Sequence, residues 1–226
     1  MNSFFFDMDE NTYSTIIQNL RDEIFYWSID NIREFPWRKT QDPYKIIIAE
    51  IMLHRTKADQ VKEVYEEFIE KYPDFNSIIR ENSPKIQTEL HSLGLFWRSD
   101  LLYKLAKEVV EKYNGILPLE KNKLLELSGV GNYIASAVLC FGNNIPEPIL
   151  DTNTVRVIGR IFGLNIKDSS RRNKKFYNIM CDLVNCDDPK RISLSLIDFA
   201  AAVCTAKDPR HDLCPVNSIC NLYKNV

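Results

Sequence analysis

The chain has 226 residues, which is enough for one large domain or two small ones with a real hydrophobic core. Its hydrophobic content of 45% and charged content of 27% are ordinary for a globular protein. No stretch approaches the roughly 18–20 apolar residues of a membrane span, and the first residues lack the basic start of a secretory signal. We therefore expect a cytoplasmic protein with no membrane partner.

Charge is unevenly distributed along the chain. The net charge of −2 argues against a strongly basic nucleic-acid-binding protein. However, residues 1–37 contain seven acids and two bases, whereas residues 151–226 contain eight acids and twelve bases. The acidic excess is thus N-terminal, and a basic face can still form elsewhere.

Helical periodicity runs through most of the chain and predicts an all-α fold. Residues 44–53 are apolar enough for a buried helix, although their three consecutive isoleucines could also form a strand. Asp188-Pro189 reads as an N-cap followed by proline at the first helical position. Apolar residues recur at i, i+3 and i+4 spacing in three further segments: 16–27, 61–72 and 102–113.

Two glycines one residue apart lie between two apolar helical segments, at Gly129 and Gly131. A tight turn of this kind can present backbone N–H groups to an anion, and the start of the following helix adds a favourable partial charge. We therefore predict a helix–turn–helix whose turn, from Gly129 through Val130 and Gly131 to Asn132, binds a nucleic-acid phosphate. The alternative is an ordinary helical hairpin with no ligand.

About twenty residues later, Asp151 begins another predicted helix. Aspartate is a favoured N-cap, and Val155, Ile158 and Phe162 would form the buried face of the helix that it caps. A carboxylate so close to a phosphate-binding turn could instead do chemistry on the bound nucleic acid. Both interpretations remain open from the residues alone.

The turn and the aspartate together resemble the helix-hairpin-helix-GPD superfamily of DNA glycosylases. The resemblance covers almost the whole chain, and it implies two helical lobes with a DNA-binding cleft between them. A six-helix barrel would span residues 43–144, and residues 1–42 with 145–226 would form the second lobe. Further segments resemble the branch with adenine and thymine mismatch glycosylases: Phe35-Pro36-Trp37-Arg38, Asp42-Pro43-Tyr44, 49–56, 93–95 and 196–199.

The resemblance implies cleavage of the bond between a base and deoxyribose, after the base has left the stack. Asp151 would stabilise the positive charge that develops at C1′ and would orient or deprotonate water. Glu50 lies among apolar residues of the segment 44–53, and in this family the matching glutamate contacts the flipped base. Its alternative is an exposed glutamate on the polar side of a helix.

Residue 133 determines the type of reaction that the resemblance implies. Members that also cut the strand have a lysine there, which attacks C1′ and forms a Schiff base. Tyr133 cannot form that imine, so we predict a glycosylase without lysine-dependent lyase activity. Tyr133 could otherwise be a core aromatic residue. Arg55 and Leu95 match the two wedge positions that fill the gap left by the flipped base.

The C-terminal cysteines resemble the family's iron–sulfur motif, with one substitution. The pattern is Cys204-x6-His211-x2-Cys214-x5-Cys220, in which His211 replaces the second cysteine. The resemblance implies a [4Fe–4S] cluster held by three cysteines and one histidine, since imidazole can also ligate iron. Zinc and the absence of any metal are the alternatives.

The resemblance thus predicts a monofunctional DNA glycosylase of base excision repair. Tyr133 and the context of Arg55 favour thymine or uracil opposite guanine as the target, in a monomer bound to mismatched duplex DNA. Adenine opposite guanine or 8-oxoguanine is the alternative target. A non-catalytic DNA-binding module is a further alternative, which the presence of both Glu50 and Asp151 argues against.

Overall fold

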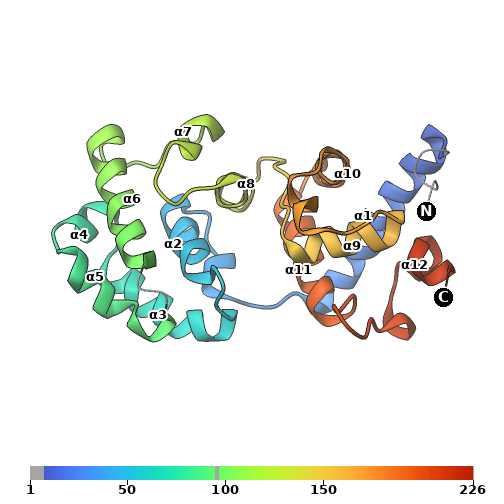
Figure 1. The fold of residues 1–226 in the computed structure, drawn as a ribbon, viewed down its shortest axis with the longest axis horizontal. Coiled ribbons are helices and arrows are strands. Elements are labelled where there is room, and N and C mark those ends of the chain that lie inside the picture. The colour runs from blue at the N-terminus through green and yellow to red at the C-terminus, as the bar shows by residue number, and fades with distance from the viewer. Residues whose placement is uncertain (1–7, 95–96, 226) are drawn as a thin grey trace. The chain divides into compact units, whose positions relative to one another are not determined.

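The computed structural model describes residues 8–94 and 97–225, and within these ranges the chain is helical with no strand (Figure 1). The prediction of an all-α fold is confirmed. The chain divides into two compact units. Unit 1 comprises Met1–Arg33 with Asn144–Val226, and unit 2 comprises Glu34–Asn143. No helix among the described residues is long and apolar enough to cross a membrane.

Unit 2 is a stack of helices with a shared apolar core. Helix α2 packs on α3 and α8, and α6 packs on α4 and α5. In chain order its helices are α2 (Pro43–Leu53), α3 (Ala58–Lys71), α4 (Phe75–Ile79), α5 (Ser83–Glu89), α6 (Trp97–Tyr113), α7 (Lys121–Leu125) and α8 (Asn132–Asn143), with 3-10 turns η1 (Pro36–Arg38) and η2 (His91–Leu93).

Unit 2 differs in two respects from the expected barrel over residues 43–144. It begins at Glu34 rather than at residue 43, because Trp37 packs edge-on against Tyr65 of α3 with ring centroids 5.3 Å apart. Its described residues also contain seven α-helices rather than six. Asp74 and Asn82 each cap a short helix through side-chain bonds to backbone N–H groups, which separates α4 from α5.

Helix α2 forms the centre of unit 2 and settles the ambiguity between helix and strand. Asp42 caps its N-terminus by accepting from Tyr44 N, and Pro43 occupies the first helical turn. Tertiary packing overrides the strand preference of its β-branched residues, because three consecutive isoleucines are fully buried: Ile46, Ile47 and Ile48. Where α2 crosses α8, a Cβ at Gly142 would lie 3.3 Å from the Ile46 side chain, so glycine permits this close approach.

Unit 1 is built on the long helix α1, which packs along α11 and α10. Asp188 caps α11 and Pro189 follows it, as predicted. Asp198 of α11 is 1% exposed and forms an ion pair with Arg33 at 2.6 Å. The helices of unit 1 are α1 (Glu10–Asn31), α9 (Thr152–Phe162), α10 (Lys174–Val184), α11 (Pro189–Ala202) and α12 (Asn221–Lys224), with 3-10 turns η3 (Asp168–Arg172), η4 (His211–Leu213) and η5 (Asn217–Ile219).

Candidate functional site

Asp151 is the N-cap of α9, and its carboxylate is firmly oriented. Oδ1 accepts hydrogen bonds from the backbone N–H groups of Asn153 and Thr154 at 2.9 and 2.8 Å. The Thr154 hydroxyl in turn accepts from Asp151 N at 3.0 Å, which completes a capping box. Oδ2 accepts one hydrogen bond, from Asn153 Nδ2 at 2.7 Å, and therefore retains lone-pair capacity for a further partner. The side chain is half-buried, so the cap does not exclude a chemical role.

A chain of side chains connects this carboxylate to the first cysteine of the C-terminal motif. Asn153 Oδ1 accepts from Arg156 at 3.1 Å. Arg156 also donates to the carbonyl oxygens of Ala200 and Cys204, both at 2.9 Å. The orientation of Asp151 is therefore tied, through two residues of α9, to the position at which the cysteine loop begins.

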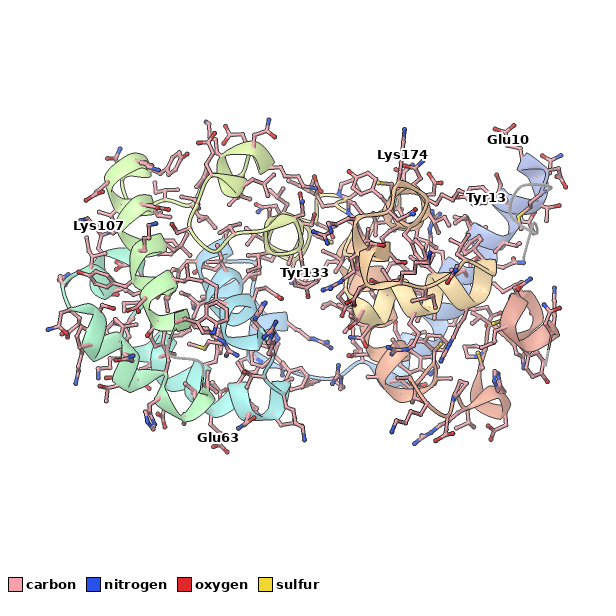
Figure 2. The ribbon with its side chains drawn as sticks, viewed as in Figure 1. Glu10, Tyr13, Glu63, Lys107, Tyr133 and Lys174 are labelled. Atoms are coloured by element: carbon pink, nitrogen blue, oxygen red, sulfur yellow. The ribbon has the colours of Figure 1, made fainter. Side chains whose placement is uncertain are left out.

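Glu50 and Tyr133 lie on α2 and α8, the two helices that pack together in unit 2. Glu50 is 6% exposed, so the alternative of a surface glutamate is wrong. A buried carboxylate is costly to maintain unless it is paired, so its burial makes Glu50 a candidate for a functional role. Tyr133 projects from the first turn of α8 and is half-buried, so it is not a core residue (Figure 2).

The predicted helix–turn–helix is present, with α7 ending at Leu125 and α8 beginning at Asn132. Gly129 adopts φ +79°, a conformation that favours glycine. Val130 is buried and anchors the turn, whereas Gly131 and Asn132 are exposed. A Cβ at Gly131 would meet nothing within 4 Å, so its backbone faces open space at the start of α8. This is the geometry that anion binding at a helix N-terminus requires.

Glu108 of α6 holds this turn in place, which the sequence patterns did not reveal. Its carboxylate accepts from Ser128 N and from the Ser128 hydroxyl, both at 2.7 Å. Burial alone would raise the pKa of Glu108, but the two bonds from Ser128, with Lys112 and Lys104 nearby, hold the pKa below its usual value. The contact is therefore fully formed above the ordinary glutamate pKa and is lost as the pH falls through the lowered value.

We expect Glu108→Gln to weaken DNA binding by about threefold to tenfold at neutral pH, because a charged acceptor is replaced by a neutral one at Ser128 N. Fluorescence anisotropy with an undamaged duplex measures this affinity. Glu111→Gln is the control, because Glu111 lies on the same helix and forms a long ion pair with exposed Lys107, at 3.7 Å. Equal affinities for the two variants would contradict a role for Glu108 in holding the turn.

Of the two residues predicted as wedges, one lies among the described residues. Arg55 is exposed and adopts φ +62° in the turn after α2. Leu95 lies outside the described residues. The turn of Arg55 is tied to α6 by Arg98, whose guanidinium donates to the carbonyl oxygen of Met52 at 2.8 Å and to that of His54.

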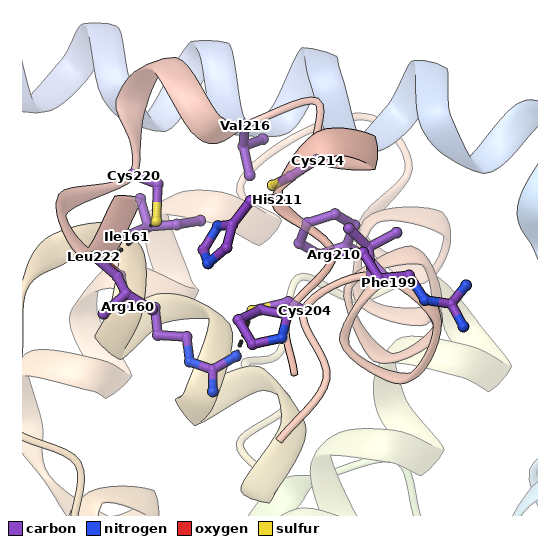
Figure 3. Close-up of a pocket in the computed structure, with 12 residues that line it drawn as sticks. Arg160, Ile161, Phe199, Cys204, Arg210, His211, Cys214, Val216, Cys220 and Leu222 are labelled. Carbon is purple, nitrogen blue, oxygen red and sulfur yellow. Dashed lines mark hydrogen bonds between the residues drawn. The ribbon is translucent and has the colours of Figure 1, made fainter. Parts of the chain in front are cut away.

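The four residues of the C-terminal motif line one pocket of unit 1: Cys204, His211, Cys214 and Cys220 (Figure 3). The imidazole of His211 lies among the three cysteines in this view. Arg160 of α9 borders the same pocket and donates to Cys204 Sγ at 3.3 Å and to Thr205 O at 2.6 Å.

The pocket suits a thiolate-binding metal or cluster in its donor set. Burial raises the pKa of the Cys214 thiol to about 11 and raises that of Cys220, and in each case Cys204 adds to the rise. Three thiols and an imidazole line this pocket, and a bound metal would have to displace the protons of the thiols. Among the described residues, however, no three such side chains already stand in metal-binding geometry. The arrangement brings the donors together without forming a closed coordination shell.

Relatives with assigned activities match almost the full length of the chain. A thymine/uracil-DNA glycosylase from Pyrobaculum aerophilum is 37% identical over 212 residues, which cover 90% of this chain and 91% of the relative. A protein of the same name from Methanothermobacter thermautotrophicus is 34% identical and covers 88% of this chain and 90% of its own length. An adenine DNA glycosylase from Buchnera aphidicola is 31% identical, but the match covers only 59% of that relative.

Solved structures of DNA glycosylases are also similar to this chain. A thermostable thymine-DNA glycosylase superposes with a TM-score of 0.88 at 32% identity and covers 96% of this chain and 99% of that structure. Endonuclease III in a non-covalent complex with DNA has the same fold, with a TM-score of 0.81 at 22% identity over 94% of this chain. The model of the HhH-GPD superfamily base excision DNA repair proteins matches residues 48–180. The chain belongs to the HhH-GPD superfamily of base excision DNA repair proteins.

Proposed function

We propose that this protein is a DNA glycosylase that hydrolyses thymine or uracil from mispairs with guanine in duplex DNA. The observation that carries the proposal is the match to thymine/uracil-DNA glycosylases along nine-tenths of both chains. The oriented carboxylate of Asp151 supplies the chemical group that such a reaction needs. The proposal includes a monomer that acts on duplex DNA, and sedimentation of the free and DNA-bound protein would test the monomeric state.

Asp151 is the residue to which we assign the chemical step. As the C1′–N bond breaks, its electron pair leaves with the base and C1′ acquires positive charge. The ionised carboxylate stabilises that charge, in the same way as in glycoside hydrolysis. A water held by Oδ2 then forms the new C1′–O bond and gives up its proton to the carboxylate. The bonds from Asn153 and Thr154 keep the carboxylate in place throughout.

The other residues have binding and protonation roles in this proposal. Glu50, a buried carboxylic acid side chain, contacts the flipped base and supplies a proton to it. The turn from Gly129 to Asn132 holds a phosphate of the duplex. Arg55 fills the gap left by the flipped base and donates hydrogen bonds to the orphaned guanine.

A panel of duplexes tests the choice of base. The protein is incubated with duplexes that contain T·G, U·G, A·G or A·8-oxoguanine, and abasic sites are then cleaved with alkali. We expect product from T·G and U·G. Product from A·G or A·8-oxoguanine alone would support adenine removal, as in the Buchnera relative. Binding without product from any duplex would support a non-catalytic module.

We propose that the enzyme lacks lysine-dependent lyase activity, because the side chain at residue 133 is a half-buried tyrosine. We expect Tyr133→Lys to gain a borohydride-trappable adduct with DNA, since its amine can attack C1′ and form an imine. Wild type should give none, and Tyr133→Phe is the matched control. Strand cleavage by wild type without alkali, or a trapped adduct with Tyr133→Phe, would contradict the proposal.

We also propose that Cys204, His211, Cys214 and Cys220 hold a [4Fe–4S] cluster, on the strength of their shared pocket and donor chemistry. The cluster would stabilise the C-terminal loop and would add no atom to the reacting base or sugar. Arg160, beside Cys204 Sγ, would neutralise part of the cluster's negative charge. Zinc bound by three cysteines and a histidine is the alternative that metal analysis distinguishes.

His211→Cys and His211→Ala separate the role of the fourth ligand. We expect His211→Cys to retain about four irons and four sulfides per chain, whereas His211→Ala should lose most of the cluster in air. Iron and sulfide analysis with visible absorption, before and after anaerobically purified protein is exposed to air, measures this. Equal iron content and identical spectra in all three proteins would remove His211 from the coordination shell. Zinc in place of iron in wild type would contradict the iron–sulfur proposal.

A further inference from the structure

The turn that carries Arg55 has an unusual conformation. Arg55 adopts φ +62°, a left-handed region that residues with a Cβ rarely occupy. The turn directly follows α2, whose C-cap is His54, and it leaves the Arg55 side chain exposed. A non-glycine residue persists in such a conformation only when its surroundings hold it there.

Arg98 is the residue that holds this turn. It is 2% exposed, and its guanidinium donates to the carbonyl oxygens of Met52 and His54, at 2.8 Å for Met52. These are carbonyl groups at the C-terminal end of α2, which lack partners within the helix and form the negative end of its dipole. The planar guanidinium donates to the two oxygens from two separate nitrogens in a fixed geometry, which the single nitrogen of a lysine cannot reproduce.

Burial of the Arg98 guanidinium in this position is energetically unfavourable. Burial lowers the pKa of Arg98, and no carboxylate among the described residues forms an ion pair with it. Its Nε is buried without a hydrogen-bond partner in the described part of the chain, and so is the hydroxyl of Thr56 in the same turn. Unsatisfied buried polar groups are rare and point to a local task other than stability. A second tie is aromatic, since the His54 ring lies edge-on to Trp97 with centroids 5.5 Å apart.

We infer that Arg98 is a positioning residue for base excision, which clamps the end of α2 to α6 and keeps Arg55 in the left-handed conformation that presents it to DNA. Its action runs through Arg55 and not through substrate contact. The inference rests on the proposed function. It predicts that the contribution of Arg98 to catalysis disappears when the Arg55 side chain is absent.

A double-mutant cycle tests this coupling. The four proteins are wild type, Arg98→Lys, Arg55→Gly and the double variant. Glycine at residue 55 removes the side chain and adopts a positive φ without penalty. Single-turnover release of thymine from T·G is measured with saturating enzyme, after correction for the active fraction, and the Kd for undamaged duplex is measured beside it. Arg80→Lys is the control, because Arg80 is an exposed arginine of the same unit.

We expect Arg98→Lys to lower the single-turnover rate about tenfold in the presence of Arg55 and less than about twofold in the Arg55→Gly background. The Kd of Arg98→Lys for undamaged duplex should stay within about twofold of wild type. The single-turnover rate of Arg80→Lys should also stay within about twofold of wild type. If Arg98→Lys does not fold, Arg98→Gln takes its place in the cycle, because its amide NH2 group still donates hydrogen bonds. Equal rate losses in both backgrounds would overturn the inference, and so would an unchanged rate for Arg98→Lys. A wild type that releases no base from any duplex would instead contradict the proposed function.

Discussion

Asp151→Asn should lower the single-turnover rate of thymine release by about 100-fold to 1,000-fold and leave the folded structure intact. Asparagine is about as good an N-cap as aspartate, so the start of α9 keeps its hydrogen bonds to the backbone. Only the negative charge is lost, and with it the stabilisation of C1′ and the acceptor for the proton of water. Release of labelled thymine, followed under single-turnover conditions, measures the loss.

The control for Asp151 separates the cap from the chemistry. Asp151→Ala removes both functions, and it should lower the free energy of unfolding by about 1 kcal/mol more than Asp151→Asn does. The two variants should nevertheless be equally inactive. If Asp151→Asn retained more than about a tenth of the wild-type rate, Asp151 would be a helix cap and the catalytic carboxylate would have to be sought elsewhere.

Arg33→Met should lower the free energy of unfolding by about 3 kcal/mol, which is more than we expect for any other substitution proposed above. Arg33 donates to Asp198 through its backbone N at 2.8 Å and through Nε at 2.7 Å. Asp198 is 1% exposed, so removal of the guanidinium takes a positive charge away from a buried carboxylate. A loss of this size is a large fraction of the stability of a typical protein. Urea unfolding followed by circular dichroism measures it.

Lys39→Met is the matched control for the ion pair. Lys39 and Glu34 form a bond of similar length, 2.7 Å, but their side chains are 66% and 77% exposed. Exposed pairs contribute little because water screens them, so this variant should lose less than about 0.5 kcal/mol. Equal losses for Arg33→Met and Lys39→Met would mean that burial of Asp198 does not govern the strength of the pair.

The helices of the fold could be predicted because their signals are local. The spacing of apolar residues indicated α1, α3 and α6, and Asp188-Pro189 marked the start of α11. The capping role of Asp151 could also be predicted from the sequence, since the hydrogen bonds that define a cap join residues within three positions of each other. The burial of Glu50 needed the structure, because periodicity within an almost wholly apolar helix does not reveal which face is polar.

The residues that hold the site in place could not be predicted from patterns. Arg98 reaches the end of α2 across 46 positions of sequence, and Arg156 reaches Cys204 across 48. Glu108 meets Ser128 across 20 positions, from a helix whose periodicity concerns only its apolar face. Each of these side chains is an ordinary charged residue in the sequence. Only the packing of the helices makes them neighbours of the turns that carry Arg55, Gly129 and Asp151.

The most direct test of the proposed activity is a competition between two substrates in one reaction. Equal amounts of a T·G duplex and an A·8-oxoguanine duplex are mixed with limiting wild-type protein, and mass spectrometry identifies the free bases and the abasic strands. We expect free thymine and an unbroken strand with an abasic site in place of the mispaired thymine, and no thymine released by Asp151→Asn. Release of adenine in preference to thymine, or of neither base while the duplexes are bound, would contradict the proposed activity.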